Sequence, residues 1–420
     1  MWSVAPSGDR LMRGGRNRFL LADTLWAAFT HPTEEEWGDY VELRTRQGFT
    51  AVLVSALPIA HDRSDASIRS PFGMAAGGLD FALGDADYWD RAERMVEHAA
   101  QRGLTTALVL LWNNYVPGTW GARLTPDHVL DDGQSEEYIR ATVDRFRRHA
   151  PIFLVSGDDD LDDEGALRRY ESAARLVREH APEAPLLWHS TPSARMPEHL
   201  AEGLADAYGY QSGHNEGWDT LPATLAEAAR ALPVRRPILN LEPCYEGLGR
   251  FRGRERHSRG DVRRASWTSI LAGAGAGLGY GAHGVWSWHR RGAQFTADDV
   301  HGRPFPASVA LGFGGARDVA VLARLVEEHD LFALEPAPGL VIGDVSGVRA
   351  ARRDDGAVIL YAPSPFPVTV SGAFSEVTTY RLDTGAPDSV RATTRVVSGS
   401  SVTEIDQPEF PGDALHVLRP

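Results

Sequence analysis

Two acidic residues stand where a short apolar run ends, and both could carry acid–base chemistry. Glu242 follows the run Arg236–Leu241, and Asp158 follows Ile152–Gly157. In a (β/α) barrel, catalytic residues come from the C-terminal ends of the strands. Two carboxyl groups placed there can cleave a glycosidic bond, one as nucleophile and the other as general acid and base. Each acid also has a structural alternative, since Asp158 could cap the next helix and Glu242 could pair with an arginine.

Other strand ends also carry polar or aromatic side chains, whereas the runs before them are apolar. The candidates for substrate binding are Asp23, Trp112, His189, Gln211, His214, Tyr280, His283 and Trp286. Polar groups of this kind hold sugar hydroxyls, and tryptophan faces stack on sugar rings, although both types also occur in cores. The three histidines could alternatively bind a metal, but no His-x-His or His-x-x-x-His spacing occurs among them. We therefore predict no metal and no cofactor.

Eight short apolar runs supply the strands that would position these residues. They are residues 19–21, 51–54, 105–111, 152–155, 185–188, 207–210, 237–241 and 278–280 with 284–286. Helical patterns lie between them, and Thr33 with Glu36 forms a capping box at the start of the first. This alternation indicates a parallel sheet, and eight strands close a barrel. A doubly wound sheet is the alternative, but no G-x-G-x-x-G follows the first strand.

The pattern changes near residue 336, after which short alternating runs are broken by Gly, Pro, Asp and Ser. Such runs are typical of a small β-sandwich. We therefore predict an α/β fold: a (β/α)8 TIM barrel over residues 1–335, followed by an all-β sandwich domain over residues 336–420. No long linker separates the two, so the sandwich should pack against the barrel and serve a structural role.

The composition excludes several classes of partner. The net charge of −14 over 420 residues argues against nucleic acid and anionic lipid, and no apolar run is long enough to span a membrane. All 43 basic residues are arginine, which rules out a Schiff-base lysine, and the single Cys244 permits no internal disulfide. The first residues lack a basic segment followed by an apolar one, so we expect a cytoplasmic chain. No motif bears on the oligomeric state.

Four segments resemble the apiosidase-like family of glycoside hydrolases. They are Phe19–Trp26, Gln211–His214, Pro237–Glu246 and Tyr280–Trp286, and the resemblance runs from about Leu11 to the C-terminus. It implies a clan A (β/α) barrel followed by a small β-sandwich. It also implies that Asp158 is the acid/base and Glu242 the nucleophile. The family usually shows Gly-Gly-Asp where this chain has Ser-Gly-Asp, and the loop over residues 55–85 departs further.

The resulting hypothesis is a retaining exo-glycosidase that removes a terminal pentofuranose, apiose or an arabinofuranose-like sugar, from a plant-derived glycoside. Three alternatives remain open at this point. The chain could be a glycosidase of other specificity, such as a galactosidase or an endo-acting enzyme. It could be a non-catalytic carbohydrate-binding protein, as the sandwich suggests. A metal-dependent hydrolase or isomerase is the third.

Overall fold

The computed structural model describes residues 1–64, 69–75, 78–250, 255–343 and 345–420. Its centre is an eight-stranded parallel sheet in the order β10-β9-β8-β5-β4-β13-β12-β11. The strands are β4 (Leu20–Thr24), β5 (Ala51–Ser55), β8 (Thr105–Trp112), β9 (Ile152–Gly157), β10 (Leu186–Leu187), β11 (Tyr208–Gln211), β12 (Ile238–Glu242) and β13 (Gly277–Tyr280). These correspond to the eight runs expected from the sequence, so the predicted barrel is confirmed.

The sheet closes between its two end strands, β10 and β11. The Asp206 N–H donates to the Leu186 carbonyl over 2.9 Å, and the Leu186 N–H donates to the Asp206 carboxylate over 2.8 Å. A Cβ on Gly209 would lie 2.7 Å from the Trp188 carbonyl oxygen. Only glycine lets the two strands approach this closely, so the two ends of the sheet meet.

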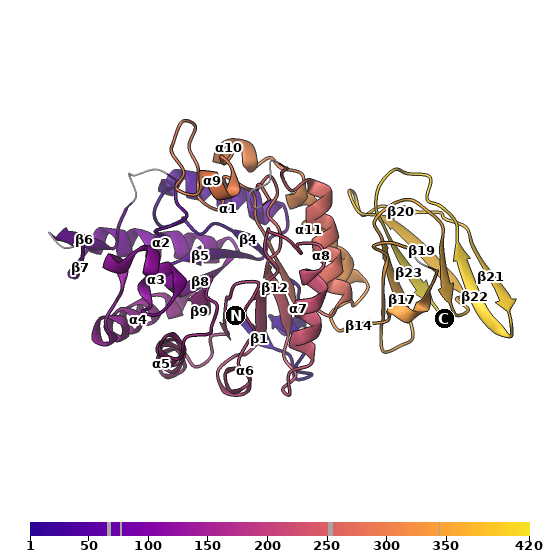
Figure 1. Cartoon of the computed structure of the whole chain (residues 1–420), viewed down its shortest axis with the longest axis horizontal. Coiled ribbons are helices and arrows are strands. Elements are labelled where there is room, and N and C mark those ends of the chain that lie inside the picture. The colour runs from indigo at the N-terminus through magenta and orange to yellow at the C-terminus, as the bar shows by residue number, and fades with distance from the viewer. Residues whose placement is uncertain (65–68, 76–77, 251–254, 344) are drawn as a thin grey trace.

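Helices surround the barrel (Figure 1). The longer ones are α1 (Glu34–Arg46), α2 (Ala86–Gln101), α4 (Asp132–Phe146), α5 (Glu164–His180), α7 (Leu221–Arg230), α8 (Arg259–Leu271) and α11 (Gly315–Glu328). Short ones lie in the loops: α3 (Trp120–Leu124), α6 (Glu198–Gly203), α9 (Asp298–His301) and α10 (Ala307–Ala310). The predicted capping box of Thr33 and Glu36 begins α1. Each of the longer helices buries part of its surface against the rest of the protein.

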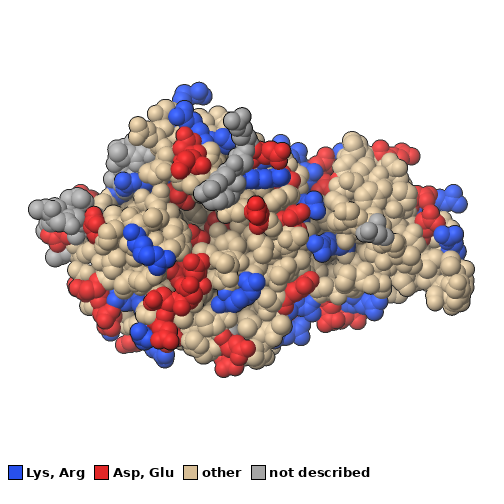
Figure 2. All heavy atoms as spheres, in the orientation of Figure 1, with Lys and Arg blue, Asp and Glu red and all other residues tan. Residues whose placement is uncertain are grey.

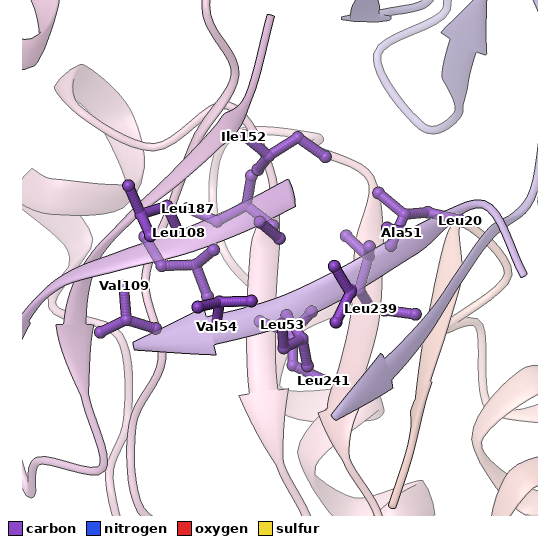
Figure 3. Close-up of a cluster of buried hydrophobic side chains, with 14 of the residues drawn as sticks. Leu20, Ala51, Leu53, Val54, Leu108, Val109, Ile152, Leu187, Leu239 and Leu241 are labelled. Carbon is purple, nitrogen blue, oxygen red and sulfur yellow. The ribbon is translucent and has the colours of Figure 1, made fainter. Parts of the chain in front are cut away.

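Aliphatic side chains of neighbouring barrel strands form a buried cluster on both faces of the sheet, because successive residues such as Leu53 and Val54 point to opposite faces. Figure 3 shows this cluster, with Leu20, Leu53, Val54, Leu108, Ile152, Leu187, Leu239 and Leu241 among the side chains drawn. All of them are 0–1% exposed except Leu187, which is 2% exposed. The barrel is therefore a packed core, and a ligand can enter only at its ends.

One predicted strand segment is wrong. Residues 283–288 form turns after β13, and the Val285 N–H donates to the Ala282 carbonyl over 2.9 Å. The segment 284–286 is apolar because Val285 and Trp286 are buried, at 0% and 4% exposure, in the loop above the barrel. A buried turn and a buried strand have the same composition over three residues.

Two small antiparallel sheets come from the first 84 residues of the chain. One contains β1 (Trp2–Val4), β2 (Leu11–Arg13) and β3 (Arg16–Asn17), and the other is the hairpin β6 (Phe72–Ala75) and β7 (Gly78–Gly84). Trp2 donates through Nε1 to Thr105 Oγ1 at the start of β8, over 3.0 Å. The first sheet therefore covers the N-terminal end of the barrel, which leaves the opposite end for a site. The hairpin belongs to the loop over residues 55–85, of which residues 65–68 and 76–77 lie outside the described residues.

The C-terminal region consists of two antiparallel sheets that form a sandwich. One has the order β14-β16-β17-β23-β19-β20 and the other β15-β18-β22-β21. The strands are β14 (Glu335–Pro336), β15 (Val341–Ile342), β16 (Arg349–Arg352), β17 (Val358–Ala362), β18 (Val368–Ser371), β19 (Glu376–Arg381), β20 (Pro387–Asp388), β21 (Ala392–Val397), β22 (Ser400–Ile405) and β23 (Ala414–Arg419). Figure 1 shows the sandwich beside α8 and α11. The change from helices to antiparallel strands falls at β14.

Charged side chains of both signs are interspersed on the face shown in Figure 2, and no large area there is basic alone. In the part of the chain that the structure describes, every helix is too short or too polar to cross a lipid bilayer.

Candidate active site

A cavity of about 320 Å³ opens at the C-terminal ends of the barrel strands. Of the residues predicted from the sequence, Trp112, Asp158, Gln211, His214, Glu242 and Trp286 line it. They come from strands or loops that are far apart in the chain and meet here because parallel strands all end at the same rim. This volume lies at the small end of the range for ligand pockets.

Glu242 ends β12 and lies at the bottom of this cavity, with 6% of its surface exposed. His189 Nε2 lies 3.1 Å from its Oε2, and His214 Nε2 lies 2.9 Å from its Oε1. Gln211 also donates through Nε2 to Oε1, over 3.3 Å. Three side chains therefore fix the carboxylate in one orientation.

Backbone N–H groups fix the tautomers of both histidines. The Asp158 N–H donates to His189 Nδ1 over 3.1 Å, and the Tyr245 N–H donates to His214 Nδ1 over 3.2 Å. Each ring therefore carries its proton on Nε2 and donates it to Glu242. Burial alone would raise the pKa of Glu242, but the hydrogen bonds from the two histidines lower that pKa to about 2. Glu242 is held as a carboxylate.

Asp158 follows β9 in the left-handed region of backbone space, with φ 52°. Its carbonyl oxygen accepts from Trp120 Nε1 over 3.0 Å and from Asn113 Nδ2 over 2.5 Å. A Cβ on Gly157 would lie 2.4 Å from a ring carbon of Trp112, so only glycine fits at that position. A non-glycine residue in this conformation is held there by its surroundings, which is common at functional sites.

The Asp158 carboxyl group has the opposite charge preference from Glu242. Burial raises the pKa of Asp158 well above its usual value, and the nearby charges of Glu242 and Asp62 raise it further. Asp158 is therefore a protonated acid under conditions in which Glu242 is ionised. Two carboxyl groups whose surroundings separate their pKa values can divide the roles of acid and nucleophile.

Aromatic rings surround the two acids. The centroids of Trp26 and Trp112 lie 5.1 Å apart in an edge-to-face contact, and Trp26 lies 5.3 Å from the His189 ring. Trp26 also donates through Nε1 to the Tyr245 hydroxyl over 3.2 Å. His189 itself is 0% exposed and lies behind Glu242 instead of on the cavity wall, so its contact is with the carboxylate.

Besides His189, three residues assigned to substrate binding by the sequence analysis do not line the cavity. Asp23 is 0% exposed and pairs with Arg44, which donates through Nε to its Oδ2 over 2.6 Å, while the Tyr40 hydroxyl donates to the same oxygen over 2.7 Å. The Tyr280 hydroxyl donates to Glu246 over 2.7 Å. Both polar groups are used by internal partners below the cavity, which corrects the prediction for these two positions.

The third of these residues, His283, is 0% exposed, and its Nε2 lies 2.8 Å from the Gly302 carbonyl oxygen. Burial lowers the pKa of His283 to about 3. Its ring stacks on Trp286, with centroids 6.1 Å apart. His283 therefore supports the wall that Trp286 forms and does not reach the cavity, which corrects the prediction there too.

Several residues that the sequence analysis did not assign to the site line the cavity: Trp26, His61, Asp62, Trp120, Asp160, Tyr245 and His301. Trp26 and Tyr245 lie in segments that carry the family resemblance, Phe19–Trp26 and Pro237–Glu246, and could have been found there. Asp62 and His301 lie in long loops with no strand-end or spacing signal. Among the described residues, no three His, Cys, Asp or Glu side chains are arranged to hold a metal ion.

The chain resembles known proteins both in sequence and in fold. The model of the apiosidase-like catalytic domain matches residues 7–333. A solved glycoside hydrolase is 19% identical, with TM-score 0.78, and the match covers 100% of this chain and 96% of that one. A glycoside hydrolase family 5 protein from Bacteroides vulgatus is also 19% identical, with TM-score 0.79, and the coverage is 100% and 93%.

At these identities the solved structures show a shared fold, and no curated protein matched. The family model spans most of the chain and includes both strand-end carboxyl groups. The chain therefore belongs to the apiosidase-like family and is a glycoside hydrolase.

Proposed function

We propose that this chain is a retaining exo-glycosidase that removes a terminal pentofuranose, apiose or a similar sugar, from a plant-derived glycoside. The observation that carries the proposal is the pair Asp158 and Glu242, which line one cavity and hold opposite charge preferences. The family supports apiose as the sugar. The small, loop-enclosed cavity supports removal of a terminal sugar over cleavage within a long chain.

The first step forms a covalent intermediate. Glu242 attacks the anomeric carbon as the bond to the leaving oxygen breaks, and Asp158 gives its proton to that oxygen. The fixed orientation of the Glu242 carboxylate favours this step, because His189, His214 and Gln211 leave it little freedom to turn away.

The second step releases the sugar. Glu242 is now an uncharged ester, so one of the negative charges that raised the pKa of Asp158 is gone. The pKa of Asp158 therefore falls, and its carboxylate can take a proton from water as the water attacks the anomeric carbon. The bond to Glu242 breaks, and the sugar leaves with the configuration it had in the glycoside.

The test is hydrolysis of an apiosylated flavone and of 4-nitrophenyl arabinofuranoside by the wild type and by Asp158→Asn and Glu242→Gln. We expect the wild type to release the sugar, with the first anomer seen by NMR matching that of the substrate. Glu242→Gln should be inactive on both substrates. Asp158→Asn should lose about 10²–10⁴-fold on the flavone glycoside and less on the nitrophenyl glycoside, whose leaving group needs less protonation.

The matched controls are Asp162→Asn and Glu216→Gln, which make the same changes at exposed positions of neighbouring loops. Both should retain wild-type rates. Inversion of the anomer, or substantial activity in folded Glu242→Gln, would reject the double-displacement assignment. Turnover of other glycosides only would mean that the enzyme removes a different sugar. Binding without turnover would favour a non-catalytic role.

A further inference from the structure

A pair of titratable side chains lies in the cavity, apart from the residues that hold Glu242. Asp62, in the loop after β5, and His301, at the end of α9, both line the cavity. His301 Nε2 lies 3.3 Å from Asp62 Oδ2, and the two side chains are 15% and 27% exposed. In the part of the chain that the structure describes, the other Asp62 carboxylate oxygen has no partner. One face of this carboxylate is thus free to accept hydrogen bonds from a ligand.

Asp62 belongs to a continuous wall that also includes the acid. The Asp158 carbonyl accepts from Trp120 Nε1 over 3.0 Å, and the Trp120 ring contacts the His61 ring with centroids 4.6 Å apart. His61 Nδ1 in turn lies 3.1 Å from the Asn114 side-chain oxygen. Asp62 therefore lies on the same wall as the proton donor.

The backbone on both sides of the pair is fixed. Ser64 and Phe295 form an antiparallel bridge. Beside it, the Arg63 N–H donates to Thr296 Oγ1 over 2.9 Å, and the Thr296 N–H donates to the Arg63 carbonyl over 3.0 Å. The two loops are thus joined across the rim, and Asp62 is held in place without a ligand. A fixed polar group is what specific recognition requires.

The charges around Asp62 keep it ionised. Burial would raise its pKa, but the hydrogen bond from His301 and the neighbouring His61 lower it, while Glu242 opposes them. The Asp62 charge in turn raises the pKa of Asp158, which lines the same cavity. An ionised carboxylate accepts hydrogen bonds only, and its two oxygens can accept from two adjacent hydroxyl groups.

We propose that Asp62, positioned by His301, binds adjacent hydroxyl groups of the terminal sugar and determines which sugar the enzyme accepts. This assignment rests on the proposed glycosidase function for its choice of ligand. A sugar that lacks one of these hydroxyls leaves one oxygen of the partly buried Asp62 carboxylate without a partner, which costs more than the loss of a surface contact. Asp62 is a binding residue in this scheme and takes no part in proton transfer.

The experiment compares the wild type with Asp62→Asn by calorimetric titration with free apiose and with L-arabinose. The same proteins are assayed for kcat and KM on 4-nitrophenyl glycosides of these sugars. We expect binding of the preferred sugar to weaken about 10- to 100-fold and KM to rise similarly, with a much smaller change in kcat. The wild type should also discriminate against an analogue that lacks one ring hydroxyl, and Asp62→Asn should lose that discrimination.

The control is Asp299→Asn, the same change at an exposed position of α9 that does not line the cavity. It should bind and turn over substrate as the wild type does. Thermal midpoints of all three proteins separate a binding effect from loop unfolding. If folded Asp62→Asn binds the sugar as tightly as the wild type, the assignment is wrong, whatever the activity. Binding by the wild type without hydrolysis would reject the glycosidase proposal alone, whereas neither binding nor hydrolysis would reject both.

Discussion

His214 is the residue whose substitution should best distinguish the role of Glu242 from that of Asp158. It donates to Glu242 over 2.9 Å and is held by the Tyr245 N–H, whereas His189 contacts both Glu242 and the backbone of Asp158. A change at His214 should therefore perturb the nucleophile and leave the acid in place. A change at His189 should perturb both.

We predict that His214→Ala moves the acidic limb of the kcat/KM profile to higher pH. The hydrogen bonds from the histidines hold the pKa of Glu242 at about 2, below its usual value, against the effect of burial. The carboxylate must be ionised to attack, so activity is lost as the pH falls through this pKa. Removing one donor raises the pKa, and protonation then occurs at higher pH. Profiles of the wild type and the variant measure the shift.

The control for this prediction is His199→Ala, whose side chain is 61% exposed and pairs with Glu171 away from the cavity. Its profile should coincide with that of the wild type. An acidic limb that stays in place in His214→Ala, together with a reduced maximum, would mean that His214 contacts substrate and does not tune Glu242.

The contact between α1 and β4 contains a buried ion pair that the sequence did not distinguish from a binding site. Arg44 and Asp23 are both 0% exposed and lie 2.6 Å apart, and the Arg44 guanidinium also packs over the rings of Tyr40, Phe49 and Tyr280. Burying two charges is costly, and their attraction offsets that cost only while both are present. This pair joins the first helix to the first strand of the barrel.

We predict that Arg44→Met lowers the free energy of unfolding by about 3–5 kcal/mol, because it leaves the buried Asp23 carboxyl group without its charged partner. The double variant with Asp23→Asn should recover part of this loss. Urea unfolding measures both, and KM of the folded enzyme should not change, since neither residue lines the cavity. Arg46→Met, which breaks the exposed pair with Glu42, should cost less than about 1 kcal/mol. A rise in KM with unchanged stability would instead show that Asp23 binds substrate.

The strands could be predicted from the sequence where the burial of their side chains and the length of the apolar run indicate the same element. The eight strands were found because a barrel strand is buried on both faces and therefore reads as a short apolar run, as in Ala51–Ser55. The same rule failed at residues 284–286, where a turn is equally buried. Asp62 and His301 could not be predicted, because their pairing depends on how two long loops meet across the rim and no period in either loop encodes it.

One face of the sandwich's first sheet shares a hydrophobic core with the barrel, while the opposite face packs into a separate core inside the sandwich. Ala351, Ile359, Tyr361, Leu415 and Val417 of the sandwich belong to the same buried cluster as the barrel strands and helices. The sandwich contacts α8 through β16 and β17, as Figure 1 also shows. A shared core of this kind makes the two domains mutually dependent for stability, unlike domains joined by a linker.

A polar cluster crosses the same interface. Arg263 on α8 donates through Nη1 to Asp318 on α11 over 2.7 Å and through Nη2 to Asp413 of the sandwich over 2.9 Å. Asp413 also accepts from the Tyr361 hydroxyl over 3.3 Å. Arg263 is 15% exposed, and the two acids are 0% and 6% exposed. The guanidinium therefore links both domains through two largely desolvated carboxylates.

We predict that the whole chain unfolds in a single calorimetric transition and that Arg263→Met lowers its midpoint by a few degrees without splitting it. The variant leaves Asp413 without its charged partner at the interface, at a cost of about 1–3 kcal/mol. Because the core is shared, this cost is borne by both domains together and cannot appear as early melting of the sandwich. Arg419→Met, which removes an exposed pair with Glu376 within the sandwich, should leave the midpoint nearly unchanged. Two resolved transitions in the wild type, or a shift confined to one of them in Arg263→Met, would show that the sandwich is an independent module attached to the barrel.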